Sequence, residues 1–254
     1  MRSNLRILSL AVVGLGFYAA PGRSAEGIYL SWNDCPLDPS SAADFVSACN
    51  VNGGQSELLC SFSLAQPTDS VLAVEITLDV QHAAALLPSW WRFDTTPCRN
   101  GSLKADADFG SRSACEDMWH GAFVVGGLAQ YTVGQPRGGP NQARIRIALA
   151  VTPASMQALN AATMHYAARV VIDNLGTVGA TPCSGCGEPA CLVLNAVMIG
   201  RPIRPEGAPS GNILLDSPGP GNPNWVTWQG GGGAACTAVP VARKTWGQVK
   251  TLYR

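Results

Sequence analysis

The feature that most constrains this fold is a pair of apolar runs, HYAARVVID and CLVLNAVMI, that lie between His165 and Ile199. In the first run every second residue from Tyr166 to Ile172 is apolar, a period that is typical of a half-buried strand. His165 falls on the other phase of this run, so we expect it on the protein surface. The second run is apolar on both phases, as in a strand that is covered on both faces. We therefore predict two adjacent inner strands, joined by the loop 174–190.

Further runs with a period of two, separated by turn residues, predict the rest of the architecture. The clearest is 72–81, in which a large aliphatic residue occupies every second position. We predict strands at 27–32, 58–64, 72–81, 89–93, 144–151, 213–215 and 225–228, with two short strands in 122–133. Residues 153–162 are the only predicted helix, of one or two turns. So many short strands with so little helix favour an antiparallel β-sandwich, immunoglobulin-like or jelly-roll-like.

The N-terminal residues have the order of features found in a secretory signal peptide. Arg2 and Arg6 precede an apolar run from Ile7 to Ala20, and cleavage is expected near Ala25. The run is shorter than the roughly 20 apolar residues that a transmembrane helix needs. No later segment of the sequence is long and apolar enough to cross a membrane. We therefore expect a secreted or cell-surface protein, with the periplasm as an alternative location.

The expected organisation has three parts. Residues 1–25 are the signal peptide, 26–203 form the sandwich, and 204–254 form a Gly- and Pro-rich segment with a tail, which Cys236 ties back to the body. Removal of the signal peptide leaves 14 basic and 17 acidic side chains. Because these charges are sparse and form no basic stripe, nucleic-acid binding is not expected.

Nine cysteines in an exported chain predict disulfides, since these bonds form and persist in oxidising compartments. A zinc or redox site around Cys183 is disfavoured, because the loop offers neither a standard fourth ligand nor a helix start. Spacing alone does not determine the pairing. The expected bridges are Cys35–Cys49, Cys98–Cys115, one between two of Cys183, Cys186 and Cys191, and one from the third of these to Cys236. Cys60 is in phase with the apolar residues of its strand and is predicted to be a buried free thiol.

Acidic residues gather in the segment 104–117. Asp106, Asp108 and Asp117 are candidate ligands for calcium, which binds six to eight oxygen atoms. The segment departs from an EF-hand loop, however, because Gly110 stands where the third acidic residue belongs. A solvated acidic loop with no cofactor is the alternative interpretation.

Four tryptophans are the candidate ligand-binding residues. Trp90, Trp91, Trp225 and Trp228 could offer flat rings that stack against sugars. Neighbouring residues on a strand face opposite ways, so one of Trp90 and Trp91 is expected to be exposed. Packing in the core or at its rim is the alternative for all four rings.

Motifs of catalysis are missing from the sequence. It has no G-x-S-x-G and no H-E-x-x-H, and its three histidines are scattered. Two of Asp94, Asp108 and Glu116 could act as the carboxylate pair of a glycosidase, but any chain with this many acidic residues offers such pairs. We therefore predict no catalytic residue.

Two resemblances accompany these expectations. The stretch Leu159–Gly176, with Tyr166, alternating aliphatic residues and an Asn-x-Gly turn, resembles the corner and following strand of fibronectin type III and immunoglobulin-like domains. The blocks SWNDC, CSGCGEPACLVLN, TWQGGGG and TWGQVKTLYR look like those of a group of uncharacterised secreted bacterial proteins. The first resemblance implies the sandwich architecture, and the second brings no known activity.

The sequence thus predicts an exported β-sandwich that binds a partner or serves as a surface component, without catalysis. A rigid scaffold would present the loops 94–119 and 174–190. The alternatives are a carbohydrate-binding module and a secreted hydrolase, and the expected partners are a glycan or a surface protein. The tail 243–254 has either a sorting role or packs on the domain through Trp246 and Tyr253.

Overall fold

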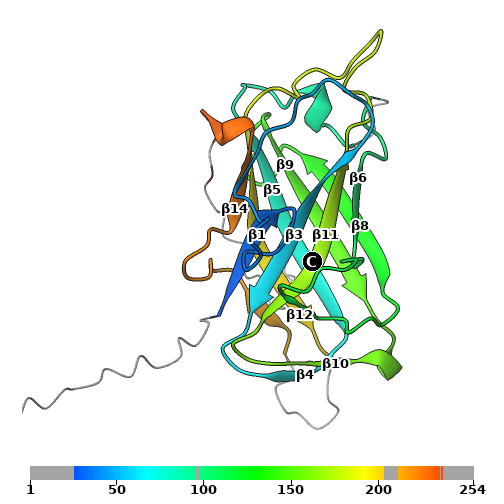
Figure 1. The fold of residues 1–254 in the computed structure, drawn as a ribbon, viewed down its shortest axis with the longest axis vertical. Coiled ribbons are helices and arrows are strands. Elements are labelled where there is room, and N and C mark those ends of the chain that lie inside the picture. The colour runs from blue at the N-terminus through cyan, green and yellow to red at the C-terminus, as the bar shows by residue number, and fades with distance from the viewer. Residues whose placement is uncertain (1–25, 95–97, 203–210, 235, 237–254) are drawn as a thin grey trace, which may run out of the picture.

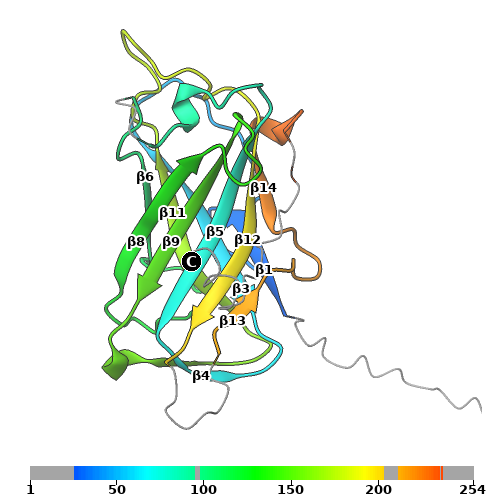
Figure 2. The same ribbon diagram turned by 180° about the vertical axis from the view of Figure 1, so that it is seen from behind.

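The computed structural model describes residues 26–94, 98–202, 211–234 and 236, and in these ranges the architecture is all-β. Two β-sheets pack face to face (Figure 1), and the view from behind brings the second sheet to the front (Figure 2). The predicted antiparallel β-sandwich is confirmed. No helix in the described ranges is long and apolar enough to span a membrane. The predicted signal peptide and the tail 243–254 lie outside the described residues.

The two sheets are built from strands that are distant in the sequence. Sheet A has the order β1 (Gly27–Trp32), β3 (Gln55–Ser63), β11 (Met164–Asp173) and β6 (Leu103–Asp106), with the short β7 (Glu116–Asp117) parallel to β11. Sheet B has the order β2 (Asp44–Phe45), β14 (Trp225–Trp228), β12 (Ala190–Gly200), β5 (Ala73–His82), β9 (Gln142–Ala150) and β8 (Val125–Val133), with β13 (Ile213–Leu215) also beside β12. A separate pair consists of β4 (Thr68–Val71) and β10 (Gln157–Leu159).

The hydrophobic core lies between the sheets, because the apolar phase of each long strand points to the opposite sheet. On β5 this phase runs from Val74 to Val80, and its side chains are buried. Burial of apolar area at about 25 cal/mol per Å² is the main stabilising term of such a core. Within up to three residues at each end, the structure confirms the strands predicted at 27–32, 58–64, 72–81, 144–151, 165–173, 191–199, 213–215 and 225–228.

The predicted pairing of the two apolar runs is wrong. β11 pairs with β3 and β6 in sheet A, whereas β12 pairs with β5 and β14 in sheet B. Residues 174–189 therefore cross from one sheet to the other. The apolar period reports which face of a strand is buried and not which strand lies beside it, so it does not distinguish a hairpin from a crossing.

The predicted surface position of His165 is also wrong, since its side chain is 0% exposed. A β-bulge between Tyr166 and Ala168 shifts the register of β11 against β3, and a shift of one residue moves side chains to the other face. His165 consequently lies beside Phe62, with ring centroids 5.3 Å apart. Tyr166 stands on the outward face, where its hydroxyl donates a hydrogen bond to the Asp34 carboxylate.

Three local predictions are wrong as well. Instead of a strand, residues 89–91 form a turn of 3-10 helix, η1 (Ser89–Trp91). Instead of a helix, residues 153–162 contain a second such turn, η2 (Pro153–Ser155), and β10, because pairing with β4 overrides local propensity. Instead of two strands, 122–133 holds the single strand β8, which has a bulge after Leu128 and positive φ angles of 115° and 147° at Gly126 and Gly127.

A buried ion pair lies on the outward face of sheet B. Arg144 Nε and Nη2 donate to the two carboxylate oxygens of Asp79 at 2.7 and 2.9 Å, and Asn195 Nδ2 donates to Asp79 Oδ2 at 2.7 Å. Asp79 is 0% exposed, so its charge is not solvated by water. An ion pair in this environment is held by its own hydrogen bonds.

Replacement of Asp79 therefore tests how sheet B is held. In Asp79→Asn the Arg144 guanidinium keeps its charge but loses its counter-charge, and we expect the free energy of unfolding to fall by about 3 kcal/mol. The matched control is Glu75→Gln, which removes a carboxylate from an exposed pair with Arg146 on the same face (3.8 Å) and should cost less than about 1 kcal/mol. Denaturant unfolding of both variants measures the two changes in the free energy of unfolding. Equal losses would contradict a stabilising role for the buried Asp79–Arg144 pair.

Candidate functional site

The loops at one end of the sandwich form the candidate functional site. Figure 1 shows them at the top of the view, where the crossing 174–189 meets the segments that precede β3 and β6. We call residues 46–54, 83–94, 98–102 and 174–189 the loop platform. Two disulfides, Cys49–Cys186 and Cys98–Cys183, fasten the crossing to the segments 46–54 and 98–102 of the platform. A native disulfide typically stabilises a fold by about 2 to 4 kcal/mol.

Hydrogen bonds fix the crossing between these disulfides. Asn52 Nδ2 donates to the Val178 carbonyl and the Val178 N–H donates to Asn52 Oδ1, both at 2.9 Å. On the opposite side, the Trp90 N–H donates to the Ser184 carbonyl at 2.8 Å, and the Ser184 N–H donates to Ser89 Oγ at 2.8 Å. The crossing is therefore held along both flanks, and its shape depends on both neighbouring segments.

Beneath the platform lies an aromatic cluster with Trp228 at its centre. The Trp228 ring centroid is 4.9 Å from Trp90, 5.5 Å from Trp91, 5.3 Å from Phe45 and 5.9 Å from Trp32. Its indole N–H donates to the Cys186 carbonyl at 2.7 Å. Aromatic pairs at such distances stabilise by about 0.5 to 1.5 kcal/mol beyond the area that they bury. The cluster thus joins β1, β14 and the platform in one rigid unit.

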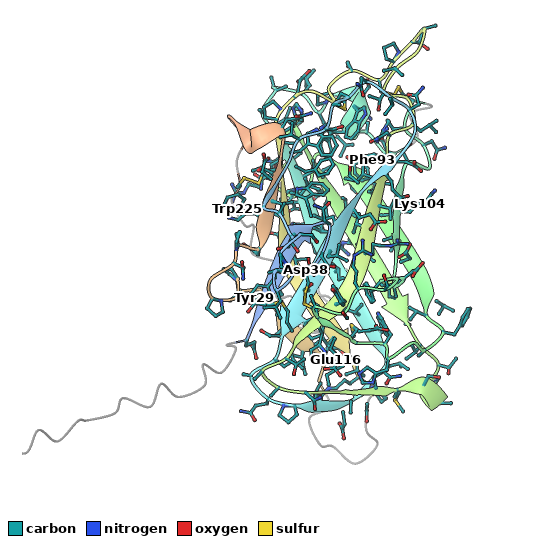
Figure 3. All side chains as sticks on the ribbon, in the orientation of Figure 1. Tyr29, Asp38, Phe93, Lys104, Glu116 and Trp225 are labelled. Atoms are coloured by element: carbon teal, nitrogen blue, oxygen red, sulfur yellow. A yellow bond between two sulfur atoms is a disulfide. The ribbon has the colours of Figure 1, made fainter. Side chains whose placement is uncertain are left out.

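Arg99 is buried within the platform and supports the start of the crossing. Its guanidinium carbon lies 4.1 Å from the Trp90 ring centroid and 5.3 Å from that of Phe93, which lies at the same end of the molecule (Figure 3). Nη1 donates to the Leu175 carbonyl, while Nε and Nη2 have no hydrogen-bond partner. Burial lowers the pKa of Arg99 to about 10. The aromatic faces replace the missing acceptors, as in a desolvated cation–π contact.

The outer edge of the platform carries aliphatic side chains. Leu175 is 55% exposed, Val178 is 37% exposed, and Val51, next to the Asn52 that holds Val178, is 51% exposed. An apolar side chain on a loop tip that is fixed by covalent bonds cannot fold away from water. This arrangement is suited to contact with another molecule, because the ordering cost of the loop is already met.

The structure places the four predicted tryptophans differently from the prediction. Trp90, Trp91 and Trp228 are fully buried, and the expectation that one of the first two would be exposed is wrong. The reason is η1, in which a helical turn directs both rings into the end of the sandwich. Trp225 is partly exposed on the outward face of β14 (Figure 3). The structure therefore does not bring the four rings together on a surface.

All eight predicted disulfide cysteines are bonded, and Cys60 is free and buried as predicted. Burial raises the pKa of the Cys60 thiol, so it is an inert core residue. The expected bridge from one loop cysteine to Cys236 is confirmed as Cys191–Cys236. The other expected pairs are wrong. The remaining bridges are Cys35–Cys115, Cys49–Cys186 and Cys98–Cys183, which join segments that are distant in sequence and close in the fold.

The predicted calcium ligands are occupied by the protein itself. Both carboxylate oxygens of Asp106 accept from Arg169, at 2.9 Å each, and Asp108 Oδ1 accepts from the Gly110 N–H at 3.0 Å. Asp117 lies beside a different part of β11, where it accepts from the N–H groups of Trp119 and Gly121. Among the described residues, no group of three or more His, Cys, Asp or Glu is arranged to hold a metal ion. The structure therefore does not bring Asp117 together with Asp106 and Asp108.

The three acids considered for a glycosidase pair lie apart and have separate partners. Asp94 accepts from Arg92 at 2.9 Å, and Asp108 lies 3.7 Å from Arg169. Glu116 lies between two imidazoles, with Oε1 3.2 Å from His120 Nε2 and Oε2 3.8 Å from His165 Nδ1. Burial lowers the pKa of His165. The contacts of these three carboxylates are thus with different residues.

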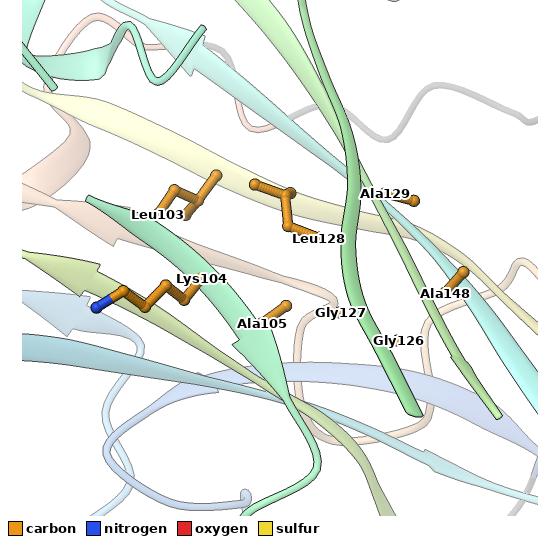
Figure 4. Close-up of a pocket in the computed structure, with 8 residues that line it drawn as sticks. All are labelled: Leu103, Lys104, Ala105, Gly126, Gly127, Leu128, Ala129 and Ala148. Atoms are coloured by element: carbon orange, nitrogen blue, oxygen red, sulfur yellow. The ribbon is translucent and has the colours of Figure 1, made fainter. Parts of the chain in front are cut away.

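Two apolar grooves, which the sequence did not predict, flank β8. The first, of about 460 Å³, lies between β6 and β8 (Figure 4). Its lining residues are Leu103, Lys104, Ala105, Gly126, Gly127, Leu128, Ala129 and Ala148. The second, of about 410 Å³, lies on the outward face of sheet B over small residues of β5, β9 and β12. The pair Gly126-Gly127 is the sequence signal, since a Cβ atom on Gly127 would lie 2.8 Å from the Ala105 carbonyl oxygen.

Replacement of Gly176 tests the geometry of the platform. This residue has a φ of +78°, and an added Cβ would lie 2.8 Å from Cys183 Sγ and 2.9 Å from the Cys98 carbonyl oxygen. Gly176→Ala should therefore lower the free energy of unfolding by about 2 to 4 kcal/mol, from backbone strain and overpacking together. Gly187→Ala in the same crossing meets no atom within 4 Å and should change it by less than about 0.5 kcal/mol. Equal unfolding midpoints for the two variants would disprove the predicted packing.

Comparison with known proteins gives no family. No family model matches the chain, and no curated protein matches it. Among solved structures, a cohesin module from a Clostridium perfringens family 33 glycoside hydrolase is similar, with 11% identity, 80% of this chain and 93% of that chain covered, and a TM-score of 0.27. A structure of AvmM, described as catalysing macrocyclization in alchivemycin A biosynthesis, has 11% identity, coverages of 78% and 93%, and a TM-score of 0.33. Likenesses this weak carry no argument about function.

Proposed function

We propose that the protein is exported and acts by binding a partner through the loop platform, without catalysis of its own. The observation that carries this proposal is the crossing 174–189, which two disulfides and the aromatic cluster hold rigid while Leu175 and Val178 remain exposed. Loops positioned by a rigid scaffold are the usual place for recognition. Preorganisation strengthens binding because the loop loses little conformational entropy when the partner arrives.

Export is supported by the covalent framework. Four disulfides join the described residues, and such bonds persist in oxidising compartments. The N-terminal order of charge and apolar residues supports the same compartment. We therefore place the partner outside the cell or at its surface. A protein partner fits the aliphatic platform edge, because exposed apolar side chains on a fixed surface gain most from contact with an apolar patch.

Binding at the platform can be tested by site-specific photo-cross-linking. A photoreactive residue is placed at position 175, and in a control protein at position 37, where Leu37 is 60% exposed but outside the platform. Each protein is incubated with material from the surface of the cells that produce it. We expect a discrete cross-linked species from position 175 that is missing from position 37. The same labelling from both positions would contradict a specific platform.

The captured partner then allows a quantitative test. Val178→Ser should weaken its binding by roughly tenfold, because truncation of an important contact residue at an interface costs about 1 to 2 kcal/mol. Leu37→Ser is the matched control and should leave the affinity unchanged. Titration with polysaccharides addresses the carbohydrate alternative, for which Trp225 is the one partly exposed ring of the four candidates. Saturable binding of a glycan that Val178→Ser does not affect would replace the proposed function.

A further inference from the structure

The outward face of sheet B carries a row of residues that are buried although they point away from the core. The register pairs Asp79 with Val193 and Gln81 with Cys191, on the opposite phase from the core residues Val80 and Leu192. The members of this row are between 0% and 7% exposed. They are Thr77, Asp79 and Gln81 on β5, and Cys191, Val193, Asn195 and Ala196 on β12. An uncovered sheet face would leave such side chains open to water.

Val193 shows that this burial comes from above the sheet. Its side chain is 0% exposed, yet it does not belong to the hydrophobic core cluster. Its neighbours in register, Asp79 and Trp225, flank it within the sheet. Side chains on neighbouring strands reduce the access of water to a residue between them, but they do not cover it from above. The strands of sheet B therefore do not account for the burial of Val193 by themselves.

Sheet A shows how this protein covers an outward face. There the insertion between β6 and β8 lies over the strands, so that Phe109 stacks on Tyr166 with ring centroids 4.9 Å apart. The Trp119 indole N–H donates to the Ala167 carbonyl at 3.3 Å. The Cys35–Cys115 disulfide pins this insertion to the loop after β1. A chain segment fixed by one disulfide thus serves as the outer layer of sheet A.

Sheet B has a disulfide in the corresponding place. Cys191 belongs to the buried outward row, and its partner is Cys236. The residues after Cys236, 237–254, lie outside the described part of the chain. Eighteen residues reach up to about 60 Å when extended, whereas β12 from Cys191 to Gly200 spans about 30 Å. The segment is therefore long enough to cover the whole face from its point of attachment.

The composition of this segment suits the face. Residues 237–254 contain four basic side chains and no acidic one, together with Trp246 and Tyr253. The face offers acceptors, since Gln142 Oε1 is buried without a hydrogen-bond partner and the Glu75 carboxylate is exposed. The second groove lies on the same face, near the start of β5 and the end of β12, and is lined mainly by Ala, Gly and other apolar residues. Basic donors and aromatic rings are complementary to acceptors and an apolar groove.

We propose that residues 237–254 of the same chain dock on the outward face of sheet B, over β5 and β12, with Cys191–Cys236 as their anchor. This inference is independent of the proposed function of the loop platform. It assigns the Gly- and Pro-rich C-terminal part a purpose: this part brings the segment to the face that it covers.

Fluorine NMR of the full chain tests the docking. Biosynthetic 5-fluorotryptophan labels all seven tryptophans, Trp246→Phe identifies the resonance of Trp246, and a synthetic peptide 237–254 gives its free position. In the full chain we expect this resonance to be displaced from the free position and as broad as those of the buried tryptophans. A resonance at the free position would overturn the proposal. The same result would leave the platform proposal intact, because the platform does not involve this segment.

Matched variants locate the docking surface. Val193→Ala should reduce the ratio of docked to free segment roughly tenfold, because it removes two buried methyl groups from the face. Val171→Ala is the control, since Val171 is also buried outside the core cluster, but on the outward face of sheet A. Equal effects of the two variants would contradict docking on sheet B. Sedimentation at the same concentrations completes the test, and a docked resonance found only in a dimer would assign the face to a second copy instead.

Discussion

The Trp228 ring packs against Trp90 and Trp91, and its indole N–H is bonded to the Cys186 carbonyl. Through these contacts the last described strand, β14, reaches two of the four segments of the loop platform, 83–94 and 174–189. The same ring meets Trp32 on β1, so the start and the end of the described chain share one aromatic cluster. Because these rings are buried and interlocked, the loops above them are supported from below as well as fastened by disulfides. The exposed aliphatic edge of the platform depends on this support.

Both sheets use their outward faces for more than contact with water. On sheet A, Arg169 bonds Asp106 with two parallel hydrogen bonds and lies 3.2 Å from Glu57, so that charges tie β11 to β6 and β3. On sheet B, Asp79 and Arg144 do the same for β5 and β9. Such pairs are stable away from water only when nearly all their hydrogen bonds are made. The outward side of β12 is therefore buried as well as its core side, which agrees with the apolar residues on both of its phases.

The sequence was informative where one local pattern decides the structure. The period of two in 72–81 identified β5, and the phase of Cys60 identified a buried thiol, because both follow from one strand alone. The sequence did not predict the features that depend on how two distant segments pack together. The bulge that reverses the phase at His165, the crossing between sheets at 174–189 and the partners of Cys49 and Cys98 all depend on which strands become neighbours. The candidate platform was therefore predicted as a loop, while its rigidity and its buried tryptophans were not.

The central claim is that disulfides between distant loops fix the crossing above the aromatic cluster. It is tested most directly by peptide mapping of the oxidised full chain, digested without reduction and analysed by mass spectrometry. We predict linked peptides that join Cys49 to Cys186 and Cys98 to Cys183. Links within the crossing, such as Cys183 to Cys186, or the local pairs Cys35–Cys49 and Cys98–Cys115, would contradict the account.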